Sequence, residues 1–498
     1  MAAQLGLSAV LTCAAIWLAG TANAWAEDDT GALQPCRLTG VSHELMCGLV
    51  KRPLDPAQPT GRSIDVHYAV LPALARNKLP DPIFLFAGGP GQSAMSLAGS
   101  ASVLFARAAN RRDVVLVDQR GTGRSAPLGC DDDAPTQPLA VLADPRRQEQ
   151  AIATCRQRLT LLPHGDLRQY TTSIAVQDTD AVRAALGAAQ INVVGGSYGT
   201  RAALEYMRQF PRHVRRAVLD GVAPPDMVLP ASFSIDNQRA LDAIFAACVS
   251  NETCNARYPH LAQPWHAMLA SLPRDVLLTH PLTGQPEQVT LTRDSVLGLV
   301  RQPLYAPHLA SALPLALAEA AQGRFSALMG LGLSLGAGRR GMALSLGMHF
   351  SVVCAEDLPR LAGATDQPGA DFGNTFADMY RRVCEHWPRG NVPEAFYTVP
   401  TSPAPALVLS GGSDPVTPPR HGERVAKALG AKARHGVVAN AGHGVMGLGC
   451  MRDVIYKFID AVDDTAAAEV PIACAQNLPR PPAFVMPSAT APANKATP

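Results

Sequence analysis

The sequence predicts an α/β fold: a mostly parallel central sheet flanked by helices, with an inserted, mainly helical lid. Two observations predict the sheet, because short apolar runs end in glycine-rich turns and stretches of helix-forming residues separate these runs. A third observation predicts the lid, since this pattern disappears between residues 223 and 400 and then returns. A chain of 498 residues is long enough for a large core with a substantial insertion.

Each expected strand is a short apolar run that stops at a turn. The expected strands are 82–87, 113–117, 191–194 and 216–219 before the insertion, and 406–409 and 436–439 after it. Helix-forming residues at 200–210 follow the third strand, as a parallel connection requires. The expected domains are a first core segment at 27–222, the lid at 223–400, a second core segment at 401–478 and a flexible, proline-rich tail at 479–498.

Composition is that of a compact globular protein. Hydrophobic residues make up 47% of the chain and charged residues 17%, whereas a disordered chain is poorer in apolar groups. The formal net charge is +2, with basic and acidic residues mixed along the sequence. No sustained positive surface is expected, so we predict no nucleic-acid partner.

The N-terminus has the pattern of a secretory signal peptide at 1–26. An apolar run at 5–20 precedes two small-residue cleavage sites, at 22–24 and 24–26, and then the acidic segment 27–29. The alternative is an uncleaved membrane anchor, for which the run is short. We predict an exported protein, periplasmic or secreted, without stable membrane insertion after signal cleavage.

Ten of the eleven cysteines follow the predicted signal peptide, and an even number in an exported protein suggests disulfides. Their wide spacings include no CxxC pair of the kind that binds zinc. Ten cysteines allow roughly 900 pairings, by the count that gives 105 for eight. Our hypothesis is that neighbours in sequence pair: Cys36 with Cys47, Cys130 with Cys155, Cys248 with Cys254, Cys354 with Cys384, and Cys450 with Cys474.

A glycine-flanked serine follows the third expected strand. Gly195, Ser197 and Gly199 form the GxSxG pattern of a nucleophile elbow, in which glycines permit a tight, strained turn between a strand and a helix. Since the chain has 41 glycines, the pattern alone is weak and its context decides. A strand precedes it and a helix follows, which favours Ser197 as a nucleophile over a Gly-Ser turn without chemistry.

A serine hydroxyl needs a base to take its proton and an acid to orient that base. Asp414 and His443 each follow an expected strand, so the acid and the base come after the serine in the order Ser, Asp, His. By the same strand order, the competitors are Asp220 for the acid and His435 for the base. We predict that Ser197, Asp414 and His443 form the catalytic triad.

Backbone N–H groups are expected to hold the oxyanion of such a reaction. One is that of Tyr198, just after the serine, and the others are those of Gly88 and Gly89 in the GGPG turn after the first expected strand. The alternative is that this turn is only a flexible connection. Asp118 and Arg120, in the segment 118–125, are expected to support the turn structurally by hydrogen bonds to it.

Five motifs together resemble the prolyl aminopeptidase and tripeptidyl aminopeptidase family of α/β-hydrolases. They are GGPG at 88–91, DQRGTGRS at 118–125, GGSYGT at 195–200, SDPVTP at 413–418 and GHG at 442–444. The segments CGLVKRPLD at 47–55 and RALDAIFAACVSNETC at 239–254 are similar to the tripeptidyl branch, and the resemblance covers most of residues 36–475. It implies the α/β-hydrolase fold.

The resemblance also implies release of residues from a free peptide N-terminus, with acidic lid residues that bind the substrate's ammonium group. The segment CAED at 354–357 is similar to a Cys-x-Asp motif of tripeptidyl relatives, but Glu356 stands where the motif has Asp. Glu356 and Asp357 are the candidates for amine binding. The alternative is that they are solvated or helix-capping charges beside a disulfide.

The leading hypothesis is a serine aminopeptidase that forms an acyl-enzyme on Ser197. An esterase for small acyl esters is the alternative, because the same triad serves both reactions. A third alternative, a binding protein without catalysis, is disfavoured by the complete triad. No cofactor or metal is expected, and the predicted partner is a peptide with a free N-terminus. The number of residues released, any proline preference and the oligomeric state are left open.

Overall fold

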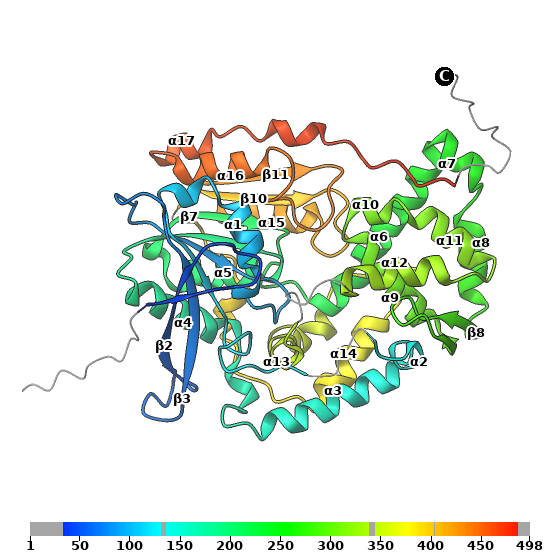
Figure 1. The fold of residues 1–498 in the computed structure, drawn as a ribbon, viewed down its shortest axis with the longest axis horizontal. Coiled ribbons are helices and arrows are strands. Elements are labelled where there is room, and N and C mark those ends of the chain that lie inside the picture. Colours follow the sequence, from blue (N-terminus) through cyan, green and yellow to red (C-terminus); the bar gives the residue numbers. More distant parts are fainter. Residues whose placement is uncertain (1–32, 131–135, 338–343, 403, 487–498) are drawn as a thin grey trace, which may run out of the picture.

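The structure, a computed structural model, describes residues 33–130, 136–337, 344–402 and 404–486 (Figure 1). The predicted signal peptide at 1–26 lies outside the described residues. A nine-stranded sheet forms the centre of the molecule. Its strands, in spatial order, are β1 (Gln34–Cys36), β2 (Leu45–Pro53), β3 (Ser63–Leu71), β5 (Val114–Val117), β4 (Ile83–Phe86), β6 (Ile191–Gly196), β7 (Val214–Asp220), β10 (Ala406–Gly411) and β11 (Ala433–Val438).

The strands from β5 to β11 run parallel, and the N-terminal strands β1, β2 and β3 are antiparallel. The predicted mostly parallel sheet is confirmed, and each expected strand overlaps one of the parallel strands. The antiparallel strands lie outside the expected runs. In β3, with the sequence SIDVHYAVL, polar and apolar residues alternate at first, so no continuous apolar run marks this strand.

Helices cover both faces of the sheet. Helices α3 (Pro145–Thr160), α4 (Thr172–Ala185), α5 (Tyr198–Gln209) and α15 (Pro419–Leu429) lie on one face, and α1 (Ala98–Leu104), α16 (Met451–Asp460) and α17 (Asp464–Ala468) on the other. Successive strand residues point to opposite faces, so Val193 and Val194 of β6 belong to different core clusters. Burial on both faces explains why the parallel strands are continuous apolar runs in the sequence.

The lid is mainly helical and has a hydrophobic core of its own. It consists of α6 (Leu229–Ser250), α7 (Glu252–Arg257), α8 (Ala262–Ala270), α9 (Arg293–Leu304), α10 (Pro307–Ala310), α11 (Leu313–Ala321), α12 (Ser326–Ala337), α13 (Leu346–Glu356), α14 (Thr375–Glu385) and the hairpin β8 (Arg274–Thr279) with β9 (Pro286–Leu291). The hairpin is an addition to the predicted lid. Most of its residues are exposed, and no long apolar run marks it.

The lid and the core share elements across the predicted boundaries at 223 and 400. Helix α13 lies within the insertion but places Met348 and Val352 in the core cluster of the sheet. Conversely, α2 (Leu139–Leu142) comes from the first core segment but places Leu139 in the lid core. The lid is therefore packed against the sheet by elements from both sides of the boundary.

The C-terminal tail is packed along its first part. Of the expected flexible tail at 479–498, the structure describes 479–486, where Ala483 and Val485 pack against the lid core. Figure 1 shows this red segment running from the region of α17 across to the lid. For residues 479–486 the expectation of a loose tail is corrected: Ala483 and Val485 are partly buried, because they pack against apolar side chains of the lid. Residues 487–498 lie outside the described residues.

Disulfides join all of the predicted neighbouring pairs, so the pairing hypothesis is confirmed. They are Cys36–Cys47, Cys130–Cys155, Cys248–Cys254, Cys354–Cys384 and Cys450–Cys474. The sequence separation is smallest for Cys248–Cys254, at 6 residues, and largest for Cys354–Cys384, at 30 residues, and both of these disulfides lie within the lid.

Of the helices in the described ranges, none combines the length and the apolar character that a bilayer crossing requires.

Candidate active site

The predicted nucleophile Ser197 lies in the sharp turn between β6 and α5. Its backbone has φ 56° and ψ −127°, a conformation that costs free energy in a residue other than glycine. The flanking glycines make room for the turn. A Cβ at Gly199 would lie 2.0 Å from Phe86 O, and a Cβ at Gly195 would lie 2.5 Å from Gly199 O. The GxSxG pattern thus forms the strained strand-to-helix turn expected of it.

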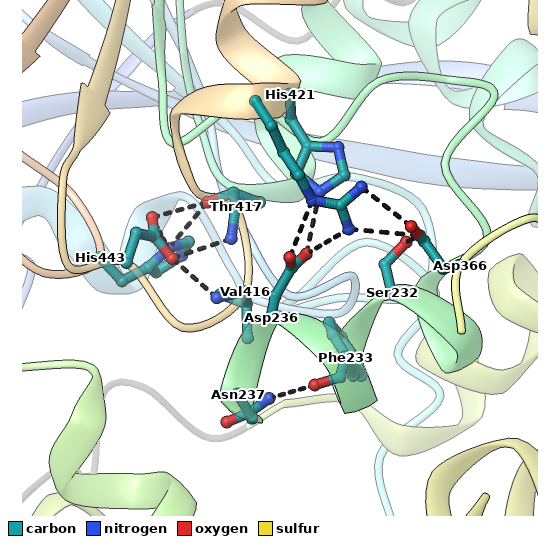
Figure 2. A network of polar contacts seen from close by, with 11 residues as sticks. Ser232, Phe233, Asp236, Asn237, Asp366, Val416, Thr417, His421 and His443 are labelled. Carbon is teal, nitrogen blue, oxygen red and sulfur yellow. Dashed lines mark hydrogen bonds and ion pairs between the residues drawn. The ribbon is translucent and has the colours of Figure 1, made fainter. Parts of the chain in front are cut away.

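The predicted acid Asp414 is buried on the loop after β10. Its carboxylate accepts hydrogen bonds from Val416 N at 2.9 Å, from Thr417 N at 2.8 Å and from Thr417 Oγ1 at 2.8 Å. It also lies 2.8 Å from His443 Nδ1. Figure 2 labels three of its partners, Val416, Thr417 and His443. The loop therefore holds this carboxylate in one orientation, facing the imidazole.

The predicted base His443 lies on the loop after β11. The residue that follows α9 in the lid, Tyr305, accepts the His443 backbone N–H at 2.9 Å and packs edge-on against the imidazole, with ring centroids 5.3 Å apart. Since Asp414 engages Nδ1, Nε2 is the nitrogen left to exchange a proton with a hydroxyl or a substrate. The competing histidine, His435, instead faces Ser410 Oγ at 2.9 Å from within β11.

Asp414 and His443 shift each other's pKa. Burial alone would raise the pKa of Asp414, but the charge of His443 and the hydrogen bonds to the carboxylate outweigh it, so this pKa lies below its usual value. Burial alone would lower the pKa of His443, but Asp414, with a smaller contribution from Asp220, raises it above the usual 6.5. Asp414 is therefore ionised at neutral pH, and the imidazole is a better proton acceptor.

Ser197 and His443 border the same turn at 220–221. Ser197 N donates to Asp220 O at 2.9 Å, and a Cβ at Gly221 would lie 3.3 Å from His443 Cε1. Among the described residues, Ser197 Oγ makes no hydrogen bond. The structure therefore brings the serine and the imidazole next to one turn without joining them, as is common in enzymes without substrate.

The competing acid, Asp220, has a different set of contacts at the end of β7. Its Oδ2 accepts the backbone N–H groups of Val445 at 2.8 Å and Met446 at 2.9 Å, just after His443. Burial raises the pKa of Asp220 to about 6. Asp220 thus anchors the histidine loop by its backbone, while Asp414 contacts the imidazole itself, which favours Asp414 as the acid.

The predicted oxyanion donors surround the serine. A Cβ at Gly88 would lie 3.3 Å from Ser197 Cβ, which places the GGPG turn against the elbow. Gly89 has φ +110°, and a Cβ there would lie 2.7 Å from Gly91 N, so this position requires glycine. Tyr198 is the first residue of α5, and its backbone N–H therefore has no acceptor within the helix. The GGPG turn and the start of α5, which carry the predicted donors, thus both lie next to Ser197.

Buried polar contacts support the GGPG turn from two sides. From the core, Asp118 accepts a hydrogen bond from Ser93 Oγ at 2.6 Å, just beyond the turn. The other expected support, Arg120, does not bond to the turn: it donates to Asp178 at 2.6 and 2.9 Å and to backbone carbonyls of other segments, so that expectation is wrong. From the lid, His349 of α13 faces Pro90 O at 3.2 Å and Tyr380 Oη at 2.7 Å. Burial lowers the pKa of His349 to about 4, so this histidine is neutral at pH 7. Its contact with the turn had no signal in the sequence, because it depends on how the lid packs.

The predicted amine-binding residues Glu356 and Asp357 are fully buried where α13 ends. Asp357 forms a bidentate ion pair with Arg201 of α5, at 3.0 and 3.1 Å. Glu356 accepts hydrogen bonds from Thr172 N at 2.7 Å and Thr172 Oγ1 at 3.1 Å, and burial raises its pKa to about 7. The structure thus gives both carboxylates protein partners beside α5, the helix that follows Ser197, and neither is solvated.

A charged network joins the lid to the loop after β10 that carries Asp414, called the acid loop below (Figure 2). Asp236 of α6 accepts hydrogen bonds from Arg420 at 2.8 and 2.9 Å and lies 3.0 Å from His421 Nε2. Arg420 also donates to Asp366 at 2.9 Å. Arg420 and His421 begin α15, shortly after Thr417. Arg420 occupies the centre of this network, since it bonds to both Asp236 and Asp366. In the described residues, no group of three or more His, Cys, Asp or Glu side chains is placed to hold a metal ion.

The fold and the site together define the class of protein. A strained serine turn follows a central parallel strand, and a buried carboxylate–imidazole pair follows two later strands, which is the plan of an α/β-hydrolase. Residues 81–449, most of the chain, match the sequence model of the family described as alpha/beta hydrolase fold. The chain belongs to this family.

Several relatives show what this chain is similar to. It is 33% identical over 199 residues to a Streptomyces coelicolor protein named tripeptidyl aminopeptidase, and the match covers 36% of each chain. It is 25% identical over 438 residues to serine protease Hip1 of Mycobacterium tuberculosis, which covers 79% of this chain and 82% of that protein. It is 28% identical over 433 residues to carboxylesterase B of the same species, which covers 77% and 78%. The resemblance to aminopeptidase-like α/β-hydrolases is confirmed, and the relatives support a hydrolase.

Proposed function

We propose that this protein is an exported serine aminopeptidase that releases residues or short peptides from free peptide N-termini. The observation that carries the proposal is the buried Asp414–His443 pair, 2.8 Å apart, beside the strained turn that contains Ser197. The relatives named tripeptidyl aminopeptidase and serine protease support a peptide substrate.

In the proposed reaction, Ser197 Oγ attacks the scissile carbonyl while His443 Nε2 takes its proton. Asp414 holds the imidazole through Nδ1 and stabilises the imidazolium that forms, in keeping with the raised pKa of His443. Backbone N–H groups of Tyr198 and of the GGPG turn donate to the developing oxyanion. His443 then gives its proton to the leaving amine, and it activates the water that releases the acyl group from Ser197.

Amine binding by Glu356 and Asp357 stays a prediction of the family resemblance, and their contacts give it a rival. Because Arg201 and Thr172 engage both carboxylates, these residues are also placed to hold α5 behind the nucleophile. We therefore compare Glu356→Gln and Asp357→Asn on free-amine and N-acetylated substrates. A loss confined to the free-amine substrate supports amine binding, whereas an equal loss on both supports the positioning of α5.

Export is part of the proposal. The signal-peptide pattern at 1–26 and the five disulfides support an oxidising compartment. N-terminal sequencing of the protein recovered from fractionated cells tests it. We expect a mature chain that begins near residue 25 or 27, in the periplasm or the medium. Recovery of the full chain from the cytosol would contradict export.

Esterase activity on small acyl esters is the second candidate. The relative named carboxylesterase B matches more of this chain than the tripeptidyl aminopeptidase does. The same serine chemistry cleaves esters, and the fold does not decide the substrate. The two candidates differ in whether a free amine on the substrate is required.

The deciding experiment uses matched substrates that carry the same acyl residues. They are mono-, di- and tripeptidyl anilides with a free amine, their N-acetylated forms and the corresponding aryl esters. For an aminopeptidase we expect acetylation to lower kcat/KM by about tenfold or more, because a buried charged contact is lost. Equal turnover of free and acetylated forms, with faster cleavage of esters, would instead support the esterase.

Matched serine variants connect the activity to the site. Ser197→Ala is expected to abolish both turnover and covalent labelling by a fluorophosphonate. The control is Ser334→Ala, which alters an exposed serine of α12 in the lid and is expected to change neither. Labelling that persists in Ser197→Ala would rule out this serine as the nucleophile.

A further inference from the structure

A guanidinium group in the lid stands among aromatic rings close to His443. Arg301 of α9 is half-buried, and its Cζ lies 5.8 Å from the ring centroid of Phe233, 5.9 Å from that of Tyr305 and 5.2 Å from that of Phe376. Aromatic rings attract a cation, and of these three residues only Tyr305 has an oxygen that can accept from the guanidinium N–H groups. The hydrogen-bonding capacity of this guanidinium is therefore largely unused.

Arg301 lacks the acidic partner that other arginines of this region have. Arg201 pairs with Asp357, and Arg420 pairs with Asp236. Across the part of the chain that the structure describes, no Asp or Glu side chain forms an ion pair with Arg301. Arginine is the side chain best suited to bind a carboxylate through two parallel N–H groups. A half-buried guanidinium without an anion is thus a candidate binding group for an anion from outside the chain.

Tyr305 connects this guanidinium to the proposed base. Arg301 and Tyr305 are four residues apart at the end of α9, so they lie on the same side of the helix. Tyr305 accepts the His443 backbone N–H at 2.9 Å and packs edge-on against its imidazole at 5.3 Å. A single aromatic ring therefore has both the guanidinium and the imidazole as neighbours.

We propose that Arg301 binds a carboxylate of the substrate on the leaving-group side of the scissile bond. The proposal rests on the proposed function, in which His443 protonates the leaving amine and the leaving peptide consequently lies beside His443 and Tyr305. An extended residue spans about 3.3–3.6 Å, so a carboxylate one or two residues beyond the cleaved bond is within reach of a guanidinium that neighbours the same ring as the imidazole. The substrate class is short peptides with a carboxylate, terminal or on a side chain, at that distance.

The test compares pairs of free-amine peptides that differ in one carboxylate. The first pair ends two residues after the cleaved bond, in either a free carboxylate or a carboxamide. The second pair ends in a carboxamide and has Glu or Gln directly after the cleaved bond. We expect the wild-type enzyme to prefer the charged member of at least one pair by about tenfold in kcat/KM, mainly through KM. The pair that shows the preference identifies the source of the carboxylate.

Substitutions at Arg301 connect this preference to the guanidinium. In Arg301→Met the ratio for the preferred pair is expected to fall close to one, and Arg301→Lys is expected to keep part of it, because it retains the charge without the planar fork. The matched control is Arg257→Met. It removes an exposed lid guanidinium 5.8 Å from the Tyr258 ring, on α7 at the far end of the lid in Figure 1, and is expected to keep the wild-type ratio.

The ratio compares two substrates in one enzyme preparation, so a partly unfolded variant does not distort it. A wild-type ratio near one for both pairs, or a ratio unchanged in Arg301→Met, would overturn the proposal. If the wild-type enzyme hydrolyses aryl esters but no peptide, the aminopeptidase function itself is wrong. Arg301 is then tested by inhibition of ester hydrolysis with a free dipeptide and with its amide. Equal inhibition by both would overturn the carboxylate site.

Discussion

At the scale of single residues, the charge of Asp414 sets the proton affinity of His443. Asp414 raises the pKa of His443 above 6.5 against the effect of burial, and the proposed reaction needs the neutral imidazole as its base. We expect kcat/KM to fall as the pH drops through this raised pKa, with a midpoint above 6.5. The measurement is the pH profile of kcat/KM on a free-amine substrate. A midpoint well below 6.5 would show that another group limits the reaction.

Asp414→Asn keeps the shape of the acid but removes its charge. We expect kcat to fall by about 10³–10⁴-fold, because an amide neither fixes the tautomer of His443 nor stabilises the imidazolium. The acid side of the pH profile should move to lower pH in the same variant. Thr417→Val, which removes one hydrogen bond to the Asp414 carboxylate, is the comparison and is expected to cost about tenfold or less. An Asp414→Asn enzyme as active as Thr417→Val would remove Asp414 from the triad.

Asp220 predicts a pH dependence of stability. Burial raises its pKa from 3.8 to about 6, so between these values the folded state binds more protons than the unfolded chain. Its contribution to stability therefore falls as the pH rises through this window, by about 3 kcal/mol in total at 1.4 kcal/mol for each pKa unit. Asp220→Asn retains an acceptor for Val445 and Met446 without titrating. Its unfolding free energy relative to wild type, from urea melts between pH 4 and 7, should rise with pH, and parallel curves would exclude this titration.

The sequence could predict the residues whose signals are local. Ser197, Asp414 and His443 each follow a strand at a glycine- or proline-rich turn, so the local motifs and the strand order together put them forward as candidates. The anchoring role of Asp220 could not be predicted in this way, because it is 225 residues from Val445 in the sequence. Such contacts depend on the tertiary fold and carry no periodicity.

At the scale of elements, α6 of the lid and α15 of the core are tied by a charged network. Asp236 is buried and holds Arg420 and His421 at the start of α15, next to the acid loop. Asp236→Asn leaves Arg420 with Asp366 as its only carboxylate partner, and we expect it to lower the free energy of unfolding by about 2 kcal/mol. This loss is smaller than for a fully buried ion pair, because Arg420 is partly exposed. We also expect a lower kcat, because the acid loop loses its support. Thermal melting and steady-state kinetics measure both effects.

The control for this network is Lys427→Gln, an exposed position on the same helix α15. It is expected to change neither stability nor kcat by a measurable amount. If Asp236→Asn behaved like Lys427→Gln, the contact between α6 and α15 would have no influence on the acid loop.

The predictability of each element follows from its burial. The parallel strands were predicted because both of their faces are buried and their residues are therefore apolar throughout. The lid hairpin was not predicted from the sequence, because β8 buries only Leu278 and β9 buries only Val289 and Leu291. Two or three buried positions in an exposed hairpin do not form a pattern that distinguishes strand from loop.

At the scale of the whole molecule, the lid and the core are built from interleaved segments. Leu139 from the first core segment packs in the lid, α13 from the insertion packs on the sheet, and Val485 from the tail returns to the lid. The change in sequence pattern near 223 and 400 marked where the parallel strands stop and resume. It could not show that elements on each side of these limits pack across them, because packing partners depend on the assembled fold.

The disulfides add a constraint whose size depends on the length of chain that each one closes. Cys354–Cys384 closes a separation of 30 residues, and Cys248–Cys254 closes one of 6. From the entropy of loop closure in the unfolded chain, we expect their removal as paired Cys→Ser variants to cost about 3.6 and about 2.2 kcal/mol of stability, respectively.

Cys354–Cys384 also joins α13 to α14, and α13 bears His349 against the GGPG turn. Its loss should therefore lower kcat as well as the melting temperature, whereas loss of Cys248–Cys254 should lower the melting temperature alone. An equal effect of the two variants on kcat would mean that α13 keeps its place without the disulfide.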